Sequence, residues 1–498
     1  MRHLFKCSRW LHKYSGLLFL IYFAAMGVSG TLLNHPQWID KLSISSTFIP
    51  ASHQLDNGRR MAIRDSVVDG DNIYIAGRAG VWHSSDNGQH FSKLERNFPQ
   101  SSYLQESYCL LLDPARPQGQ PAYLLAGTRT GLYRYDFKSQ GWSQLHLAHE
   151  PLTIVDLVAT DQHILALSTQ HCFRSLATQP TLGFTPIELT FAETAATTHT
   201  ALHHLLLRLH DGTLFGQIGR TIVDICGGLL LFLSLSGLLI WYLPWSNRRS
   251  RKQRIFLKVS WWYRYHLKVG IYAAFFIALI TLSGILIRPP FIATIKHISV
   301  ANGPLWQAET PRIDKGFYHL HTDTVFFATR KGIFSTTAHL DRPFTLDARM
   351  SAIPMSTMGT TVFKPLNEQH LVIASFRGAY LWNFTNQQLE KIPLPPRTMA
   401  TSAVIEKEQL RYIVDYRRGL IATEPNEHWQ LPDAMNDTPI SLWLWLFELH
   451  NGRLFRQWLG LYTGWIIPIG GLLLLLNLLS GCFDWWWHRR RRNHRNRK

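Results

Sequence analysis

The chain contains one pattern twice: a short Leu-His-x-Gly turn followed by a long apolar run that ends in Ser-Gly and Trp. The first copy spans residues 209–241 and the second spans residues 449–485, with their Ser-Gly pairs at 236–237 and 480–481. A repeat of this kind is considered before any other signal, because missing it leads to the wrong fold. The duplication predicts two half-units of similar architecture.

A second pair of related stretches precedes these copies. His12-x-x-x-Gly16 leads an apolar run to Ser29-Gly30, and His266-x-x-x-Gly270 leads another to Ser283-Gly284. The landmarks of the two stretches are separated by one constant offset. Each half therefore consists of a histidine, a helix, a large insert, the Leu-His-x-Gly turn and a second helix.

Four stretches are apolar over the roughly 20 residues that a membrane-spanning helix needs. We expect transmembrane helices at 14–34, 209–243, 266–288 and 449–484, where the second and fourth include their Leu-His-x-Gly turns. The residues after the first helix, 32–36, lack a small-x-small cleavage site. We therefore expect an uncleaved anchor and not a signal peptide.

The formal net charge of +18 suggests nucleic-acid binding, but the positions of the basic residues argue against it. The excess of Lys and Arg lies in residues 1–13, 244–265 and 485–498, which contain no Asp or Glu. These segments flank the apolar helices, as cytoplasmic segments do under the positive-inside rule. We expect both termini and the 244–265 loop in the cytoplasm, with the inserts 35–208 and 289–448 on the external side of the membrane. The basic tail then contacts membrane lipid and no nucleic acid.

Both inserts alternate strand-like apolar runs with Gly-bearing turns, which is the pattern of strand, tight turn, strand. Successive copies are about 40–50 residues apart, the length of one propeller blade. The copies, three in each insert, lie at Tyr74–Trp82, Leu124–Tyr133, Ile164–Ala166, Phe327–Phe334, Ile373–Tyr380 and Val414–Ile421. The expected fold class is a membrane α-helical protein with an all-β periplasmic domain, a six- or seven-bladed β-propeller split between the two halves. Two separate small β-domains are the alternative.

Ser84-x-Asp86-x-Gly88-x-x-Phe91 resembles the Asp-box turn of sialidase-type propellers. An Asp box is a structural turn, and the propeller fold hosts many functions. Without a visible set of catalytic acids, we expect this domain to bind or dock a partner.

The five cysteines include no CxxC pair, so they predict neither a zinc site nor a disulfide scaffold. Cys109 and Cys172 both lie in the first insert, where a disulfide is permitted and two free thiols are the alternative. Cys226 and Cys482 lie within helices and are expected to be small apolar packing residues.

Four histidines occupy repeat-related places at helix ends, where ionisable residues are candidates for function. If the halves pack about a pseudo-twofold axis, His12 faces His266 at the cytoplasmic side and His210 faces His450 at the external side. Two facing imidazoles are the arrangement for bis-histidine haem ligation. Two haems of the b type, one towards each membrane face, would form an electron path across the bilayer. The alternative is that each histidine is an amphipathic interfacial anchor.

Other ionisable residues near the membrane boundaries offer further possibilities. His35, at the external end of the first helix, is the reserve candidate for a haem ligand, before His203, His204, His297 and His488. Zinc is disfavoured because two imidazoles leave a tetrahedral site short of ligands. We expect Asp224 to pair with Arg220, with proton handling as the alternative, and we expect Pro468 to kink the fourth helix.

No GxGxxG, P-loop or flavin motif occurs in the cytoplasmic segments. The pattern Arg9-Trp10-Leu11-His12-x-x-x-Gly16, the two Leu-His-x-Gly-x-Leu-Phe turns and the Ser-Gly-Leu-Leu-Ile-Trp sequence at 236–241 resemble the PepSY-associated transmembrane family. That resemblance covers the four helices, about a quarter of the chain. It implies that His12, His210, His266 and His450 are haem ligands, as in bacterial inner-membrane ferric-siderophore reductases. No PepSY domain is recognisable in the inserts, which leaves the substrate open.

The sequence thus predicts an inner-membrane protein that transfers electrons through two haems to a ferric siderophore or other ferric chelate in the periplasm. The electron donor would be membrane quinol or a cytoplasmic reductase. The rival interpretation is a non-enzymatic receptor or assembly factor, whose helices only anchor a propeller that binds a periplasmic partner. A transporter built on repeats is disfavoured, because four helices leave little room for a substrate path.

Overall fold

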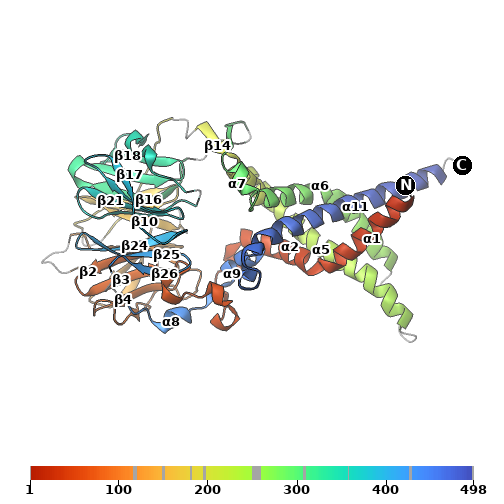
Figure 1. The fold of residues 1–498 in the computed structure, drawn as a ribbon, viewed down its shortest axis with the longest axis horizontal. Helices are drawn as coiled ribbons and strands as arrows, with labels where there is room; N and C mark the ends of the chain where they lie inside the picture. Colours follow the sequence, from red (N-terminus) through yellow and green to blue (C-terminus); the bar gives the residue numbers. More distant parts are fainter. Residues whose placement is uncertain are drawn as a thin grey trace. The chain divides into compact units, whose positions relative to one another are not determined.

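The computed structural model describes residues 2–115, 121–148, 152–179, 182–193, 198–249, 259–304, 306, 310–356, 358–424 and 429–495. The chain divides into two compact units (Figure 1). The helical unit comprises Met1–Ile39, His199–Gln307 and Trp443–Lys498, and the β unit comprises Asp40–Thr198 and Ala308–Leu442. Each unit therefore draws on both halves of the sequence repeat. Residues 250–258 of the predicted basic loop and residues 496–498 of the tail lie outside the described residues.

The helical unit contains five long helical segments: α1 (Arg2–Leu18), α2 (Leu20–Asn34), α5 (Gly216–Arg249), α6 (Val259–Leu286) and α11 (Ile466–Arg495). Three spans in the described residues are long and apolar enough to cross a membrane, and α1 and α2 make a fourth if they are counted as one span. The predicted multi-pass membrane architecture is confirmed.

The first span is not the straight helix that the sequence predicts. Its two parts, α1 and α2, meet at Phe19 with a bend of 63°. One turn earlier, the Ser15 hydroxyl donates to the Leu11 carbonyl at 2.5 Å, and such bonds to the preceding turn bend helices. Pro468 lies in the first turn of α11, where the missing N–H has no helical partner to lose. It therefore does not kink the middle of that helix.

The long helices pack as a chain of neighbours: α2 on α5, α5 on α6, α6 on α11 and α11 on α1. Small residues let the backbones approach closely, as in other membrane helix pairs. An added Cβ on Gly27 of α2 would lie 2.6 Å from the Gly227 carbonyl oxygen of α5. Glycine is therefore required on both sides of this helix contact.

Each Leu-His-x-Gly turn ends a short helix. α4 (Leu202–His210) and α9 (Leu442–His450) both stop at their histidine, and Gly212 and Gly452 follow with φ of 81° and 70°. This left-handed conformation is the usual glycine ending of a helix. It explains why the repeat keeps His and Gly two residues apart.

Six antiparallel sheets make up most of the described β unit (Figure 1). The first insert supplies β2 (Asp65–Asp69) to β5 (Ser92–Lys93), β6 (Ser107–Leu112) to β9 (Gly141–Leu145) and β10 (Ile154–Ala159) to β13 (Thr185–Ile187). The second supplies β16 (Ile313–His319) to β19 (Thr345–Leu346), β20 (Thr360–Pro365) to β23 (Gln388–Lys391) and β24 (Ala400–Glu406) to β26 (Gly419–Ala422). The last sheet has three strands and the others four.

The first strands of the six sheets form a closed ring. β2, β6, β10, β16, β20 and β24 are neighbours in this order, and β24 returns to β2. This arrangement is a six-bladed propeller, with its first strands innermost. Because β10 of the first insert packs beside β16 of the second, the alternative of two separate β-domains is excluded.

The hairpins predicted from the sequence are the second and third strands of the blades. The first, for example, is β3 (Asn72–Gly77) paired with β4 (Gly80–Ser84), and even the weak copy at Ile164 forms the paired strands β11 (His163–Ser168) and β12 (Cys172–Leu176). Buried ion pairs join strands from the two inserts: Lys315 of β16 with Asp156 of β10, and Lys364 of β20 with Asp65 of β2. The two halves thus share one core.

The cysteines and the Asp box of the β unit were also subjects of prediction. Cys109 and Cys172 are buried free thiols in different blades, so the permitted disulfide is not formed. In the Asp box, the Gly88 amide donates to the Ser84 hydroxyl, and Asp86 accepts the amides of Gln89 and His90. It is the structural turn that the sequence predicts.

Candidate functional site

The first histidine pair lies at the end of the helical unit where the basic segments begin, here called the basic end. His12 of α1 and His266 of α6 have ring centroids 6.1 Å apart and ring planes 84° apart. His12 Nδ1 lies 2.9 Å from the Ser480 hydroxyl and 3.0 Å from the Asn477 carbonyl. His266 Nδ1 lies 2.8 Å from the Ser236 hydroxyl. Both Nδ1 atoms are therefore engaged, and neither Nε2 has a hydrogen-bond partner among the described residues.

The second pair lies at the opposite end of the bundle, here called the insert end. His210 of α4 and His450 of α9 have ring centroids 6.1 Å apart. His210 Nδ1 donates to the Ile280 carbonyl at 2.8 Å, and His450 Nδ1 lies 2.8 Å from the Ser29 hydroxyl. The repeat thus brings together the two pairs of histidines that the sequence analysis matched. Whether they hold haem stays a prediction.

The Ser-Gly pairs, which mark the repeat in the sequence, contact the histidines. Each serine lies at or beside an Nδ1 contact, and each glycine lies against a ring. An added Cβ on Gly284 would be 2.7 Å from His210 Cε1, and one on Gly481 would be 3.3 Å from His12 Cε1. Gly237 and Gly30 stand in the same relation to His266 and His450. The Ser-Gly pairs recur in the sequence, but only the contacts between helices show that they lie against the histidine rings.

The two pairs fit the spacing of a cofactor held between imidazoles. Two imidazoles on opposite sides of one metal ion, with metal–nitrogen bonds of about 2 Å, have ring centroids roughly 6 Å apart. The engaged Nδ1 atoms fix each ring and leave Nε2 as the nitrogen available for a ligand bond, as outer-sphere partners do for metal ligands. Along α6, from His266 to Gly284, the two pairs are about 27 Å apart at 1.5 Å per residue.

A cavity of about 640 Å³ surrounds the basic-end pair. Cofactor pockets commonly measure about 300–1,000 Å³. Four glycines from four helices, including Gly16 and Gly270, widen the cavity, and Leu20, Phe23 and Leu474 supply apolar walls. Arg9 and Lys13 lie at its lining as positive charges, and Asp484, 4.0 Å from Arg9, lies there as a negative one. The donor set and the space therefore suit a flat, apolar group with acidic substituents, which is the chemistry of haem.

The insert-end pair has a positive neighbour that the sequence analysis missed. Arg288, just after α6, lies within electrostatic range of both His210 and His450. Its side chain has no hydrogen-bond or ion-pair partner among the described residues. By contrast, Arg453 pairs with the buried Glu448 at 2.8 Å. Arg288 is thus free to face an acidic group.

A polar pocket of about 540 Å³ lies beside the insert-end pair. Its lining includes Asn34, Trp38, Arg220 and Asp211, the last of which directly follows His210. On the other side, its lining begins at Leu33, one helical turn beyond Ser29, which contacts His450. The residues that line this pocket are therefore close in sequence to His210 and to Ser29, the partner of His450.

Two predictions about this region are corrected. Asp224 pairs with His35 Nε2 at 2.7 Å and not with Arg220, because α2 brings His35 alongside α5. The His35 ring stacks on Trp38 with centroids 4.1 Å apart. His35 thus faces Trp38 and Asp224 and not a second imidazole, so it is not part of either histidine pair.

The remaining candidate histidines form no comparable pair. His203 and His204 are neighbours in α4, His297 is exposed, and His488 Nδ1 bonds to the Asp484 carbonyl. Across the described part of the chain, no group of three or more His, Cys, Asp and Glu side chains could hold a metal ion.

Comparison with known proteins gives one specific match and several weak ones. Among solved structures, the extracellular domain of a hybrid two component system from B. thetaiotaomicron is 10% identical, with a TM-score of 0.37, and the match covers 74% of this chain. The chain spans only 33% of that structure. A structural genomics protein of unknown function from Bacteroides thetaiotaomicron VPI-5482 is 7% identical, with a TM-score of 0.37, over 77% of this chain and 74% of that one. The propeller is therefore assigned here from its own strand pairing.

Among curated proteins, none matches the chain in sequence. The family model of the PepSY-associated TM region matches residues 9–489, which include all the long helices and both histidine pairs. The chain belongs to the family of the PepSY-associated TM region.

Proposed function

We propose that this chain is a dihaem electron-transfer protein of the bacterial inner membrane that reduces ferric chelates in the periplasm for iron uptake. One observation carries the proposal: two facing histidine pairs, each with its Nδ1 atoms engaged, lie at opposite ends of one helix bundle. Membership of the family agrees with it. Iron held by two imidazoles in a haem supplies one-electron chemistry at a potential set by ligands and burial.

The side chains around each pair suggest how the protein would hold and tune such a group. His12 and His266 would ligate at the basic end, and His210 and His450 at the insert end. Arg9 and Lys13 at one cavity and Arg288 at the other pair would neutralise acidic substituents. The apolar helix walls would exclude water and keep the ligand bonds dry, which helps to set the potential.

The basic segments give the proposed direction of transfer. Under the positive-inside rule, the basic end lies in the cytoplasm and the insert end in the periplasm. Electrons would enter at the basic end, from membrane quinol or from a cytoplasmic reductase. They would leave at the insert end to a ferric siderophore or another ferric chelate.

The polar pocket beside His210 and His450 is the proposed place of contact with the acceptor. Arg220, Asn34 and Gln217 can donate hydrogen bonds to the oxygen atoms of a chelate. Reduction to Fe(II) weakens the hold of hard oxygen ligands, which favour the harder ferric ion. The reduced iron would then be released to an importer.

An absorption spectrum of the purified full-length protein, oxidised and reduced, tests the proposal. We expect a sharp reduced α-band and close to two haems per chain. His266→Ala and His450→Ala should each remove about one haem, and different ones, whereas the exposed His297→Ala should remove none. The reduced protein should then be reoxidised by a ferric chelate.

A colourless protein, produced with ample haem, would contradict the proposal and favour the rival function. In that case the helices anchor the propeller, and the propeller is a receptor or assembly factor for a periplasmic partner. If the His266→Ala and His450→Ala proteins each lost both haems, the cause would be misfolding and not the loss of one ligand. The His297→Ala protein, which should keep both haems, is the reference for a folded variant.

A further inference from the structure

The turns on the two faces of the propeller carry charges of opposite sign. In all six blades the turn between the innermost and second strands contains an acidic residue; these residues are Asp71, Asp113, Asp161, Asp323, Glu368 and Glu408. In five of the six blades the turn between the second and third strands contains an arginine; these residues are Arg78, Arg129, Arg330, Arg377 and Arg417. Because successive strands run in opposite directions, the two sets of turns lie on opposite faces.

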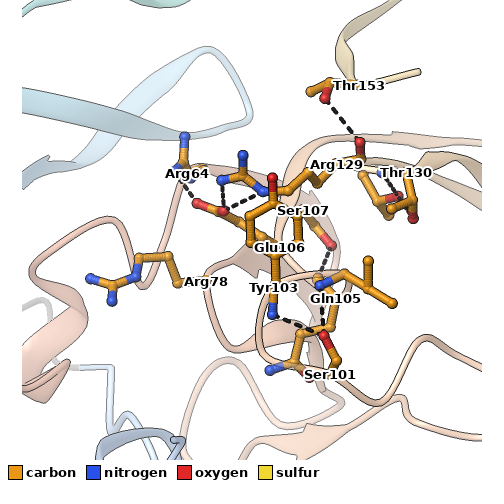
Figure 2. Close-up of polar contacts among 12 residues, drawn as sticks. Arg64, Arg78, Ser101, Tyr103, Gln105, Glu106, Ser107, Arg129, Thr130 and Thr153 are labelled. Atoms are coloured by element: carbon orange, nitrogen blue, oxygen red, sulfur yellow. Dashed lines mark hydrogen bonds and ion pairs between the residues drawn. The ribbon is translucent and has the colours of Figure 1, made fainter. Parts of the chain in front are cut away.

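On the arginine face, two guanidinium groups share one carboxylate near the first two blades (Figure 2). Arg64 and Arg129 both pair with Glu106, which directly precedes the innermost strand of the second blade. Arg64 lies over the Tyr108 ring at 4.4 Å, and Arg129 lies over the Tyr103 ring at 4.5 Å. These contacts fix both guanidinium groups in one geometry.

The Glu106 carboxylate is an example of the group that this arginine cluster binds. Burial alone would raise the pKa of Glu106, but the charges of Arg129 and Arg64 outweigh burial and lower it to about 2. The carboxylate is therefore ionised at neutral pH. Arginine forks of this kind bind carboxylates through two parallel hydrogen bonds.

The cluster contains more positive charge than Glu106 can neutralise. Arg78 directs its guanidinium away from Glu106 (Figure 2) and donates to the Arg60 carbonyl at 3.0 Å, with no carboxylate partner among the described residues. Arg60 donates to the Ser52 carbonyl and the Tyr416 hydroxyl. Burial lowers the pKa of Arg78, because the more distant Glu106 does not offset its desolvation.

The other carboxylates of this face have partners of their own. Asp314 forms an ion pair with Arg330 at 3.9 Å. Asp415 accepts hydrogen bonds from the backbone amides of Met399, Arg417 and Arg418. In addition, Arg64 Nε is buried without a hydrogen-bond partner. A partly buried cation without a counter-charge reduces the stability of the fold. We therefore infer that these arginines serve a ligand and not the fold.

We propose that the arginine face of the propeller, centred on Arg64, Arg78 and Arg129, binds a small polycarboxylate anion. Identifying that anion with the ferric chelate rests on the proposed function; binding of the anion itself does not. Arg78, which has no carboxylate partner among the described residues, supplies the donors, and Glu106 holds the neighbouring guanidinium groups in place. The propeller then selects anionic, carboxylate-bearing chelates over neutral or cationic ones.

The test is calorimetric titration of the full-length protein in neutral detergent with citrate, at constant ionic strength. We expect one site on the wild type, weakened at least tenfold in Arg78→Gln, since a charge-assisted hydrogen bond is lost. Arg78→Lys should lie between the two, because it keeps the charge but not the fork. The control Arg342→Gln removes an exposed charge beyond β18 (Gly332–Thr337), on the acidic face, and should bind like the wild type.

Thermal unfolding separates a ligand site from a structural cluster. Without citrate, Arg78→Gln should be at least as stable as the wild type, because an uncompensated cation is removed. Saturating citrate should raise the Tm of the wild type by about 5 °C and that of Arg78→Gln by much less. No binding by the wild type, equal binding by Arg78→Gln, or equal weakening in Arg342→Gln would overturn the proposal.

Two further arms distinguish the source of the anion and the dependence on haem. Binding of the arginine face to vesicles of anionic phospholipid, with no response to citrate, would assign the face to lipid headgroups and overturn the proposal. The titration does not need haem, so a colourless protein that binds citrate would contradict only the proposed function. With haem present, ferric citrate should reoxidise the wild type at least tenfold faster than Arg78→Gln, and a small uncharged oxidant should not distinguish them.

Discussion

At the scale of single residues, one small unit recurs around the histidines. A serine lies at or next to the Nδ1 contact, and the glycine that follows it lets the ring approach the helix. At His210 the contact is the Ile280 carbonyl, which also accepts the Ser283 hydroxyl. A bond at Nδ1 therefore fixes all four rings, although at His210 the partner is a carbonyl oxygen and not a serine hydroxyl.

Ser236→Ala should loosen the group that we propose at the basic end. Without its hydroxyl partner, His266 loses the contact that orients its ring, and outer-sphere changes of this kind weaken metal binding about 10–100-fold. The rate of haem loss to a scavenger protein measures the effect. Ser234→Ala is the matched control, since Ser234 lines the same cavity but bonds to the Leu230 carbonyl. Equal rates in the two variants would contradict the prediction.

Glu106→Gln should make the propeller less stable, in a pH-dependent way. The pKa of Glu106 is about 2 in the folded chain and near 4.5 when the side chain is exposed in an unfolded chain, so its stabilisation is present above about pH 4.5 and is lost as the pH falls towards 2. The shift corresponds to on the order of 3 kcal/mol at neutral pH. Denaturant titrations from pH 3 to pH 8 should show wild-type and variant curves that converge at the acid end. Parallel curves would contradict this account.

The residues predicted from the sequence and those that were missed differ in a physical way. His12, His210, His266 and His450 could be predicted because the repeat fixes their places along the helices. The bond from His35 to Asp224 could not, because it joins α2 to α5 across a large insert and nothing in the sequence gives the rotation of the two helices. The position of Arg288 beside the insert-end histidines could not be predicted for the same reason.

At the scale of elements, glycine decides where strands turn and where helices meet. Turn glycines such as Gly80 and Gly332 have positive φ and made the blade hairpins predictable from the sequence. The bend at Phe19 was not predictable, because it depends on one serine hydroxyl bonding within α1 and no proline or glycine stands at the break. Helix boundaries were therefore less predictable than hairpins.

Gly227→Ala should weaken the contact between α2 and α5. The new Cβ would be 2.8 Å from the Gly27 carbonyl oxygen and would also collide with the Thr31 hydroxyl. Such overpacking costs about 1–3 kcal/mol. Thermal unfolding in detergent should show a lower Tm for this variant. Gly228→Ala, where an added Cβ meets nothing within 4 Å, should not change it; a similar loss in both variants would refute the close approach.

At the scale of the whole molecule, neither half of the chain can complete either unit. The propeller ring takes three blades from each insert, and buried ion pairs such as Lys315 with Asp156 cross between them. Each histidine pair takes one member from each half. This interdependence was predictable from the repeat, whereas the number of blades required the closure of β24 onto β2.

Cutting the chain between its halves should therefore not separate them. A protease site inserted within residues 250–258 should yield two fragments that remain together in mild detergent and keep the spectrum of the intact protein. Either fragment produced alone should aggregate, because half a ring leaves the apolar faces of its end blades uncovered, as between the third and fourth blades. Size-exclusion chromatography after cleavage measures the association. Fragments that migrate separately would contradict the shared core.

The pairing of one histidine from each half has a consequence for symmetry. A chain of half this length could form the same two sites only by associating with a second copy of itself, as an isologous homodimer does. Both members of each site would then be identical, and a change at one would appear at the other. Joining the copies in one polypeptide removes that constraint. Here the Ser29 hydroxyl holds His450 while the Ile280 carbonyl holds its repeat-related partner His210, so the two imidazoles of one site are free to differ.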